Sequence, residues 1–191
     1  LLTKFFFFKI NFNDDYPFNP PKAKYLTQGN NIRFNPNLYT NGKVCLSILG
    51  TWSGPSWSAL YNLKTILTSL RGQVLVENPL VNEPGYEKYK KSCQDCISYN
   101  SIVSFGTTKF AIIEALKGNL PIPKEYHEYF QNIINEYFKN NYQKYVDRFN
   151  KLKSTDNNKQ FSCKYQSQNQ TPKYDDLIDS LGAHYISVIK K

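Results

Sequence analysis

The chain has 191 residues and a mass of 22.2 kDa, which fits one domain of ordinary size with an appendage. Its formal net charge of +9 would suit an acidic partner, but no dense run of Lys and Arg and no aromatic–basic motif localises that charge, so nucleic-acid binding is not expected. The opening LLTKFFFFKI is too short to span a bilayer and lacks a signal-peptide cleavage site, so no membrane partner is expected.

Four cysteines, at positions 45, 93, 96 and 163, do not form a disulfide framework in a chain of this length. They indicate free thiols of a reducing compartment, the cytoplasm or the nucleus. Cys93 and Cys96 form a Cys-x-x-Cys, but no second pair or His cluster stands near enough for a metal site. A redox pair would be expected to follow a thioredoxin-like strand, so both are interpreted as helix or loop thiols.

Short strands are expected in the first 50 residues. The run KFFFFKINF is rich in residues that favour strands and precedes the turn cluster at residues 13–17. A second short strand is expected at residues 22–27, after prolines that exclude a helix. A third is expected in KVCLSI, entered through the tight-turn dipeptide Asn41-Gly42.

Helices are expected after Trp57. Apolar residues recur every three or four positions over residues 60–74, which predicts a helix with Ser58 as its N-cap. Further helices are expected over residues 83–91, 98–117 with a stop at Gly118, 123–152 and 174–189. Residues 153–172 carry few large apolar side chains and predict a solvated linker. Strands followed by helices favour an α+β fold with an antiparallel sheet.

The blocks YPFNPPKAKYLT, NPNLYTNGKVCLSIL, WSALYNLKTIL and NPLVNEPGYEKY occur in this order. Together they resemble the core of a ubiquitin-conjugating enzyme, from residue 4 to about residue 117, and the residues around Cys45 resemble a large-bodied subgroup. The resemblance implies the UBC fold, an antiparallel sheet packed on helices, over residues 1–118, and a helical C-terminal extension over 119–191. Family members begin with a further helix and strand, so both are expected to be missing and the chain, which has no Met, is expected to be a fragment.

The resemblance also implies a chemistry. Family members accept ubiquitin, or a related modifier, as a thioester on a cysteine, and Cys45 matches that cysteine; thiolate is both a good nucleophile and a good leaving group. Asn37 matches an asparagine that either stabilises the tetrahedral oxygen or holds the loop. Asn35 stands where the family usually has His and is expected to shape the loop through its own amide. Glu77 lies where an acid of the family helps orient the incoming lysine.

Phe18, Ser58, Ala59 and Leu60 match the two loops by which family members contact ligases. The implied partners are ubiquitin or a ubiquitin-like modifier, its activating enzyme and ubiquitin ligases. No cofactor is expected on this chain, because ATP is used by the activating enzyme. Two alternatives stay open: a relative that binds ubiquitin without carrying it, and a cysteine hydrolase that uses Cys45 with His127 or His184.

Overall fold

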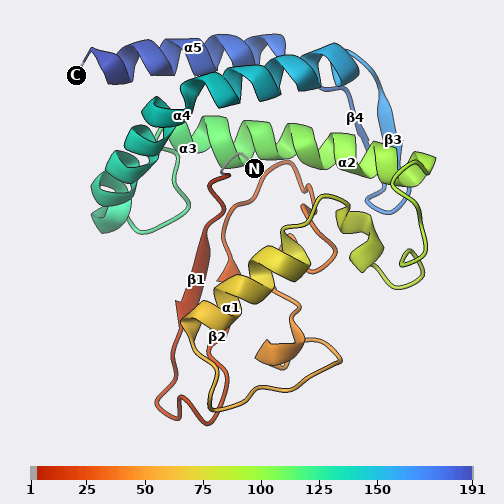
Figure 1. Ribbon diagram of the computed structural model, residues 1–191, viewed down its shortest axis with the longest axis vertical. Coiled ribbons are helices and arrows are strands. Elements are labelled where there is room, and N and C mark those ends of the chain that lie inside the picture. The colour runs from red at the N-terminus through yellow and green to blue at the C-terminus, as the bar shows by residue number, and fades with distance from the viewer. Residues whose placement is uncertain (1–3, 191) are drawn as a thin grey trace. The chain divides into compact units, whose positions relative to one another are not determined.

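The computed structural model describes residues 4–190 (Figure 1). The chain divides into two compact units. One is formed by Phe8–Asn100, hereafter the 8–100 unit, and the other by residues 101–190 with residues 4–7, hereafter the C-terminal unit. This division differs from the boundary expected at residue 118, which separated the family core from its extension.

The 8–100 unit combines a small antiparallel sheet with helices, which confirms the α+β class. Strands β1 (Phe8–Asn11) and β2 (Lys22–Tyr25) pair antiparallel, with Phe8 opposite Tyr25. The third strand expected at KVCLSI is wrong: only isolated bridges join Lys24 to Lys43 and Leu38 to Val44, and a 3-10 turn follows at Ser47–Leu49. The backbone there is hydrogen-bonded to Asn37 and Thr51, which leaves no regular ladder to form.

Helix α1 (Leu63–Ser69) begins five residues after the predicted cap. Its N-cap is Asn62, whose Oδ1 accepts the Thr65 N–H at 3.2 Å while Thr65 Oγ1 accepts the Asn62 N–H at 3.4 Å. This reciprocal pair is a capping box, which outweighs the weaker cap that Ser58 could offer. A π-helical turn over Leu70–Val74 continues the helix, as the apolar spacing predicted.

The helix expected over residues 83–91 is wrong. A 3-10 turn ends at Asn82, and turns follow in which residues 87–91 are all exposed, so no apolar face exists to stabilise a helix. The predicted helix over 98–117 is confirmed, with an earlier start. It runs as α2 (Gln94–Gly106), a π-helical stretch (Thr107–Ile113) and α3 (Glu114–Leu116), and it ends before Gly118, whose φ is +85°.

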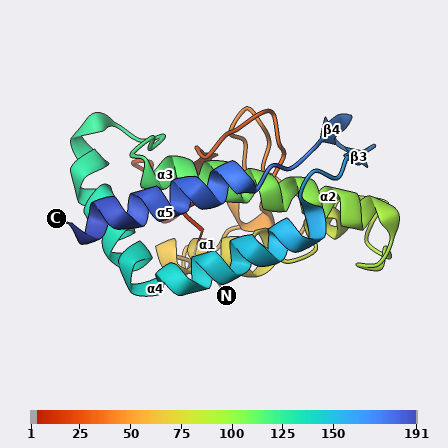
Figure 2. The ribbon, with the colours of Figure 1, turned by 90° about the horizontal axis from the view of Figure 1, so that it is seen from above.

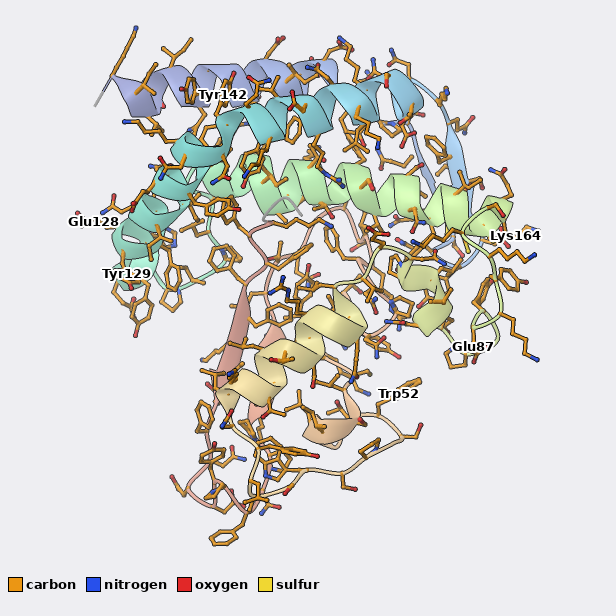
Figure 3. The ribbon with its side chains drawn as sticks, viewed as in Figure 1. Trp52, Glu87, Glu128, Tyr129, Tyr142 and Lys164 are labelled. Atoms are coloured by element: carbon orange, nitrogen blue, oxygen red, sulfur yellow. The ribbon has the colours of Figure 1, made fainter. Side chains whose placement is uncertain are left out.

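In the C-terminal unit, a 3-10 turn leads into helix α4 (His127–Asp156), which kinks at Asn141 and packs its second part along α5 (Asp175–Ile189), as Figures 1 and 2 show. Tyr142 of α4, labelled in Figure 3, stacks on Tyr185 of α5, with ring centroids 3.7 Å apart and planes 7° apart. These helices confirm the two predicted over 123–152 and 174–189. The buried core of this unit includes Ile112, Leu116, Ile134, Phe138, Tyr145, Phe149, Tyr174 and Leu181.

The solvated linker expected over residues 153–172 is wrong. The last turn of α4 extends to Asp156, and a hairpin of β3 (Phe161–Cys163) and β4 (Gln168–Gln170) fills much of the remainder. Phe161 and Cys163 are buried and Ser162 between them is exposed, an alternation too short to predict a strand. No helix among residues 4–190 has the length and apolar character needed to cross a membrane.

Candidate active site

The segment that carries Cys45 begins with a turn that only glycine fits. Gly42 has a φ of +91°, and a Cβ there would lie 2.9 Å from the carbonyl oxygen of Tyr25. The Gly42 carbonyl accepts the Tyr25 N–H at 2.8 Å, and Asn41 Oδ1 accepts the Lys43 N–H at 3.0 Å. The turn is therefore docked on β2, and Cys45 follows it at a fixed place.

Cys45 and Asn37 are joined by two hydrogen bonds. The Cys45 N–H donates to the Asn37 carbonyl at 2.8 Å, and Asn37 Nδ2 donates to the Cys45 carbonyl at 2.8 Å. Asn37 Oδ1 is buried and has no hydrogen-bond partner within residues 4–190. The Asn37 side chain thus holds the backbone of Cys45.

Asn35 is 1% exposed and organises the loop around Asn37. Its Oδ1 accepts the Asn37 N–H at 2.7 Å, and its Nδ2 donates to the Val74 carbonyl at 2.7 Å. Asn82 Nδ2 donates both to Asn35 Oδ1, at 3.4 Å, and to the Gln73 carbonyl, at 2.6 Å. Asn35 therefore ties the loop to the end of the π-helical turn by its amide.

Thr51 is a site residue that the sequence reasoning missed. Its Oγ1 accepts the Leu46 N–H at 2.9 Å and donates to the Val44 carbonyl at 2.7 Å, so one hydroxyl holds the residues on both sides of Cys45. Trp52, which follows it, is 44% exposed (Figure 3). The sequence carries no signal for this role, because a threonine in an irregular loop matches many patterns.

The Cys45 residue is only 1% exposed, so the segment around it covers the thiol. Glu77, expected to orient an incoming lysine, is exposed and forms an ion pair with Lys91 Nζ at 2.8 Å. The backbone of Cys45 is well fixed, and the carboxylate of Glu77 is engaged by Lys91.

The two loops expected to contact ligases are tied together. Trp57 Nε1 donates to the Pro17 carbonyl at 2.7 Å, and the Tyr16 ring lies 6.1 Å from the Trp57 ring. Phe18 is 81% exposed and Leu60 is 90% exposed, so neither belongs to the core. Next to Leu60, Ser58 Oγ accepts the Leu60 N–H at 3.3 Å and Ala59 is exposed. The loops, joined by the Trp57–Pro17 bond, present two large exposed apolar side chains, a feature of binding hot spots.

Both histidines of the alternative hydrolase belong to the C-terminal unit, whereas Cys45 belongs to the 8–100 unit. His127 Nε2 bonds to the Ile122 carbonyl at 2.9 Å, and His184 Nε2 bonds to Asn135 Oδ1 at 3.0 Å. These contacts give each ring a partner within its own unit. Within residues 4–190, no group of three His, Cys, Asp or Glu side chains could hold a metal ion.

Residues 2–105, just over half of the chain, match the family model described as "Ubiquitin-conjugating enzyme". Ubiquitin-conjugating enzyme E2 Z of Xenopus tropicalis is 43% identical over 135 residues, which cover 70% of this chain and 42% of that protein. The human E2 Z is 41% identical over 135 residues, covering 70% of this chain and 38% of its own length. The human dual E2 ubiquitin-conjugating enzyme/E3 ubiquitin-protein ligase BIRC6 is 38% identical over 134 residues, covering 65% of this chain and 3% of its own length.

The chain spans less than half the length of the E2 Z relatives that it matches. The blocks around Cys45 and the NEPGYE stretch resemble the Z type most closely within the large subgroup, and the identities with E2 Z proteins confirm that resemblance. The family match covers every residue of the Cys45 site described above, from Asn35 to Asn82. The chain therefore belongs to the ubiquitin-conjugating enzyme family.

Proposed function

We propose that this protein carries ubiquitin or a ubiquitin-like modifier as a thioester on Cys45 and transfers it to a lysine amine or to a ligase. The observation that carries this proposal is the pair of 2.8 Å hydrogen bonds between Cys45 and Asn37, which holds an amide donor against the backbone of the candidate nucleophile. A thiol in this position can accept an acyl group and release it again. The names of the relatives support the same activity.

Charging is a thioester exchange. The Cys45 thiolate attacks the carbonyl carbon of the modifier's C-terminus, which arrives as a thioester on the activating enzyme, and the thiolate of that enzyme leaves. In the second step, an amine attacks the same carbonyl and Cys45 leaves as the thiolate. Both steps pass through a tetrahedral carbon with a negatively charged oxygen, which a fixed hydrogen-bond donor stabilises.

Asn37 is the residue that supplies this donor. An amide nitrogen carries two hydrogens, and the Cys45 carbonyl accepts one of them. The other can donate to the oxygen that develops beside the sulfur, while the first continues to hold the loop. Asn35 and Thr51 act as positioning residues, because they fix the backbone of Asn37 and of the neighbours of Cys45.

The partners follow from the same chemistry. ATP is consumed by the activating enzyme, and this chain binds no cofactor directly. The surface formed by Phe18 and Leu60 receives a ligase.

The four free cysteines support a reducing compartment, the cytoplasm or the nucleus.

One observation favours a second candidate. Cys45 is 1% exposed, and a relative that binds ubiquitin without carrying it needs no accessible thiol. The two functions separate in a charging assay in which the protein, ATP, an activating enzyme and each modifier are mixed and resolved with and without reductant. A reductant-sensitive band supports the conjugating function and identifies the modifier. Binding of a modifier without such a band, under conditions that charge another conjugating enzyme, supports the binding function.

A further inference from the structure

Cys93 and Cys96 are arranged around the start of α2. Cys93 immediately precedes the helix, and its carbonyl accepts the Ile97 N–H at 3.0 Å. Its Sγ accepts the N–H of Cys96 at 3.2 Å, so the sulfur takes the place of the capping oxygen that usually fills this position. The two cysteines thus face each other across the first turn of α2.

The two thiols differ in access. Cys96 is 0% exposed, whereas Cys93 is partly exposed. Burial, reinforced by the neighbouring Cys93, raises the pKa of the Cys96 thiol to about 11, so Cys96 is protonated at neutral pH. A partly exposed cysteine thus lies beside a buried one, the arrangement in which the first can attack a reagent and the second can attack the first.

The Cys93 sulfur lies at the N-terminal end of α2. The first turn of a helix presents N–H groups and the positive end of its dipole. Lys90 and Lys91 precede Cys93 and are exposed, and Asp95 in the first turn is the opposing charge. Lys91 pairs with Glu77 at 2.8 Å, so Lys90 and Asp95 leave the local charge close to balanced.

We propose that Cys93 and Cys96 form a redox-active dithiol that low-molecular-weight disulfides oxidise to an intramolecular disulfide while Cys45 stays reduced. The Cys93 thiolate attacks a disulfide RSSR, which forms a mixed disulfide and releases RS⁻. The Cys96 sulfur then attacks the Cys93 sulfur, the bond between the Cys93 sulfur and SR breaks, and the Cys96 proton leaves with the second RS group. Two protein thiols are oxidised and one RSSR is reduced to two RSH.

The selectivity follows from burial. Cys45 and Cys163 are each 1% exposed, and neither has a second cysteine within three positions in the sequence. A small disulfide therefore reaches the partly exposed Cys93 first, and Cys96 resolves the mixed disulfide before a second molecule of reagent is needed. This dithiol is a site separate from the Cys45 chemistry, and its reactivity does not depend on the proposed conjugating function.

Mass spectrometry of the native protein tests the proposal. The reduced protein is incubated with excess glutathione disulfide, its remaining thiols are alkylated after denaturation, and it is digested with trypsin. The tryptic peptide of residues 92–109 follows Lys91, ends with Lys109 and carries both thiols. We expect that peptide to lose two hydrogens and to escape alkylation, while the peptides carrying Cys45 and Cys163 are alkylated in full.

Three variants define the order of the steps. Cys96→Ser should accumulate the glutathione mixed disulfide on Cys93, Cys93→Ser should leave Cys96 reduced, and the matched control Cys163→Ser should behave as the wild type. The proposal is overturned if the wild-type peptide keeps a mixed disulfide, if both of its thiols remain reduced, or if Cys45 is oxidised first. The wild-type measurement needs no substitution, so it decides the question even if a variant fails to fold.

Discussion

Asn37 binds Cys45 twice, through its backbone carbonyl and through its side-chain nitrogen, each at 2.8 Å. The side-chain bond supports the loop, and the proposed function assigns the same amide a second role as donor to the developing oxygen. Loss of that side chain should therefore affect both the stability of the protein and the rate at which the modifier is discharged, and the two can be measured separately.

Asn37→Ala should lower stability by about 0.5–1.5 kcal/mol, because it removes one intramolecular hydrogen bond. It should also slow discharge of the modifier to free lysine by about a hundredfold or more, the usual cost of about 2.7–4 kcal/mol for one oxyanion donor. Thermal melting and single-turnover discharge measure the two effects, with Asn132→Ala, an exposed position on α4, as the control. A destabilised variant that discharges at the wild-type rate once charged would refute the oxyanion role.

Thr51→Val should destabilise the protein by about 1–3 kcal/mol, because it keeps the shape but leaves the Leu46 N–H and the Val44 carbonyl without their partner. Charging should slow as well, since the backbone on both sides of Cys45 loses its support. Thr51→Ser keeps the hydroxyl and should restore both quantities. Urea unfolding and the initial rate of thioester formation measure them, and equal values for the valine and serine variants would remove Thr51 from the site.

Gly42→Ala should destabilise the 8–100 unit by about 1–3 kcal/mol, because alanine must adopt a φ of +91° there and its Cβ would press against the Tyr25 carbonyl. Gly72 supplies the matched control, since its φ is not positive and an added Cβ meets no atom within 4 Å. Gly72→Ala should therefore be neutral or stabilise by about 0.4–1 kcal/mol. Chemical denaturation of both variants measures the difference, and equal losses would contradict the turn geometry.

Phe18→Ala and Leu60→Ala should abolish stimulation by a ligase domain without affecting charging. Both side chains are more than four-fifths exposed, so their removal should change the free energy of unfolding by no more than about 0.5 kcal/mol. Lysine discharge with and without a ligase domain that stimulates the wild type measures the effect. Tyr129→Ala is the control, at a position 66% exposed on α4 (Figure 3). A ligase that stimulates the two variants as strongly as the wild type would place its docking surface elsewhere.

Features with a strong local signal were predictable from the sequence. The Asn41-Gly42 turn, β1, β2 and the helices α4 and α5 each follow from a dipeptide or a repeated spacing whose physical cause lies within a few residues. Features that depend on competition between two local signals were not predictable from the sequence. Ser58 and Asn62 could each cap a helix, and Asn62 caps α1 because Thr65 completes the reciprocal pair.

The site was predictable only in part. Cys45, Asn37 and Asn35 stand in blocks that resemble the family, so their proximity could be expected from the motifs. The contact of Thr51 with Val44 and Leu46 depends on how an irregular loop folds back, which no periodic pattern encodes. The same holds for the hairpin of β3 and β4, where each strand is only three residues long.

The central claim, that Cys45 carries the modifier, is tested most directly by locating the linkage. Each variant is charged with activating enzyme, ATP and the modifier, and the adduct is resolved with and without reductant and mapped by mass spectrometry. We expect Cys45→Ala to form no adduct, Cys45→Ser to form an oxyester that resists reductant because oxygen is the poorer leaving group, and the triple variant Cys93→Ser, Cys96→Ser, Cys163→Ser to charge as the wild type does. A folded triple variant that fails to charge, or a reductant-sensitive adduct that persists in Cys45→Ala, would contradict the account.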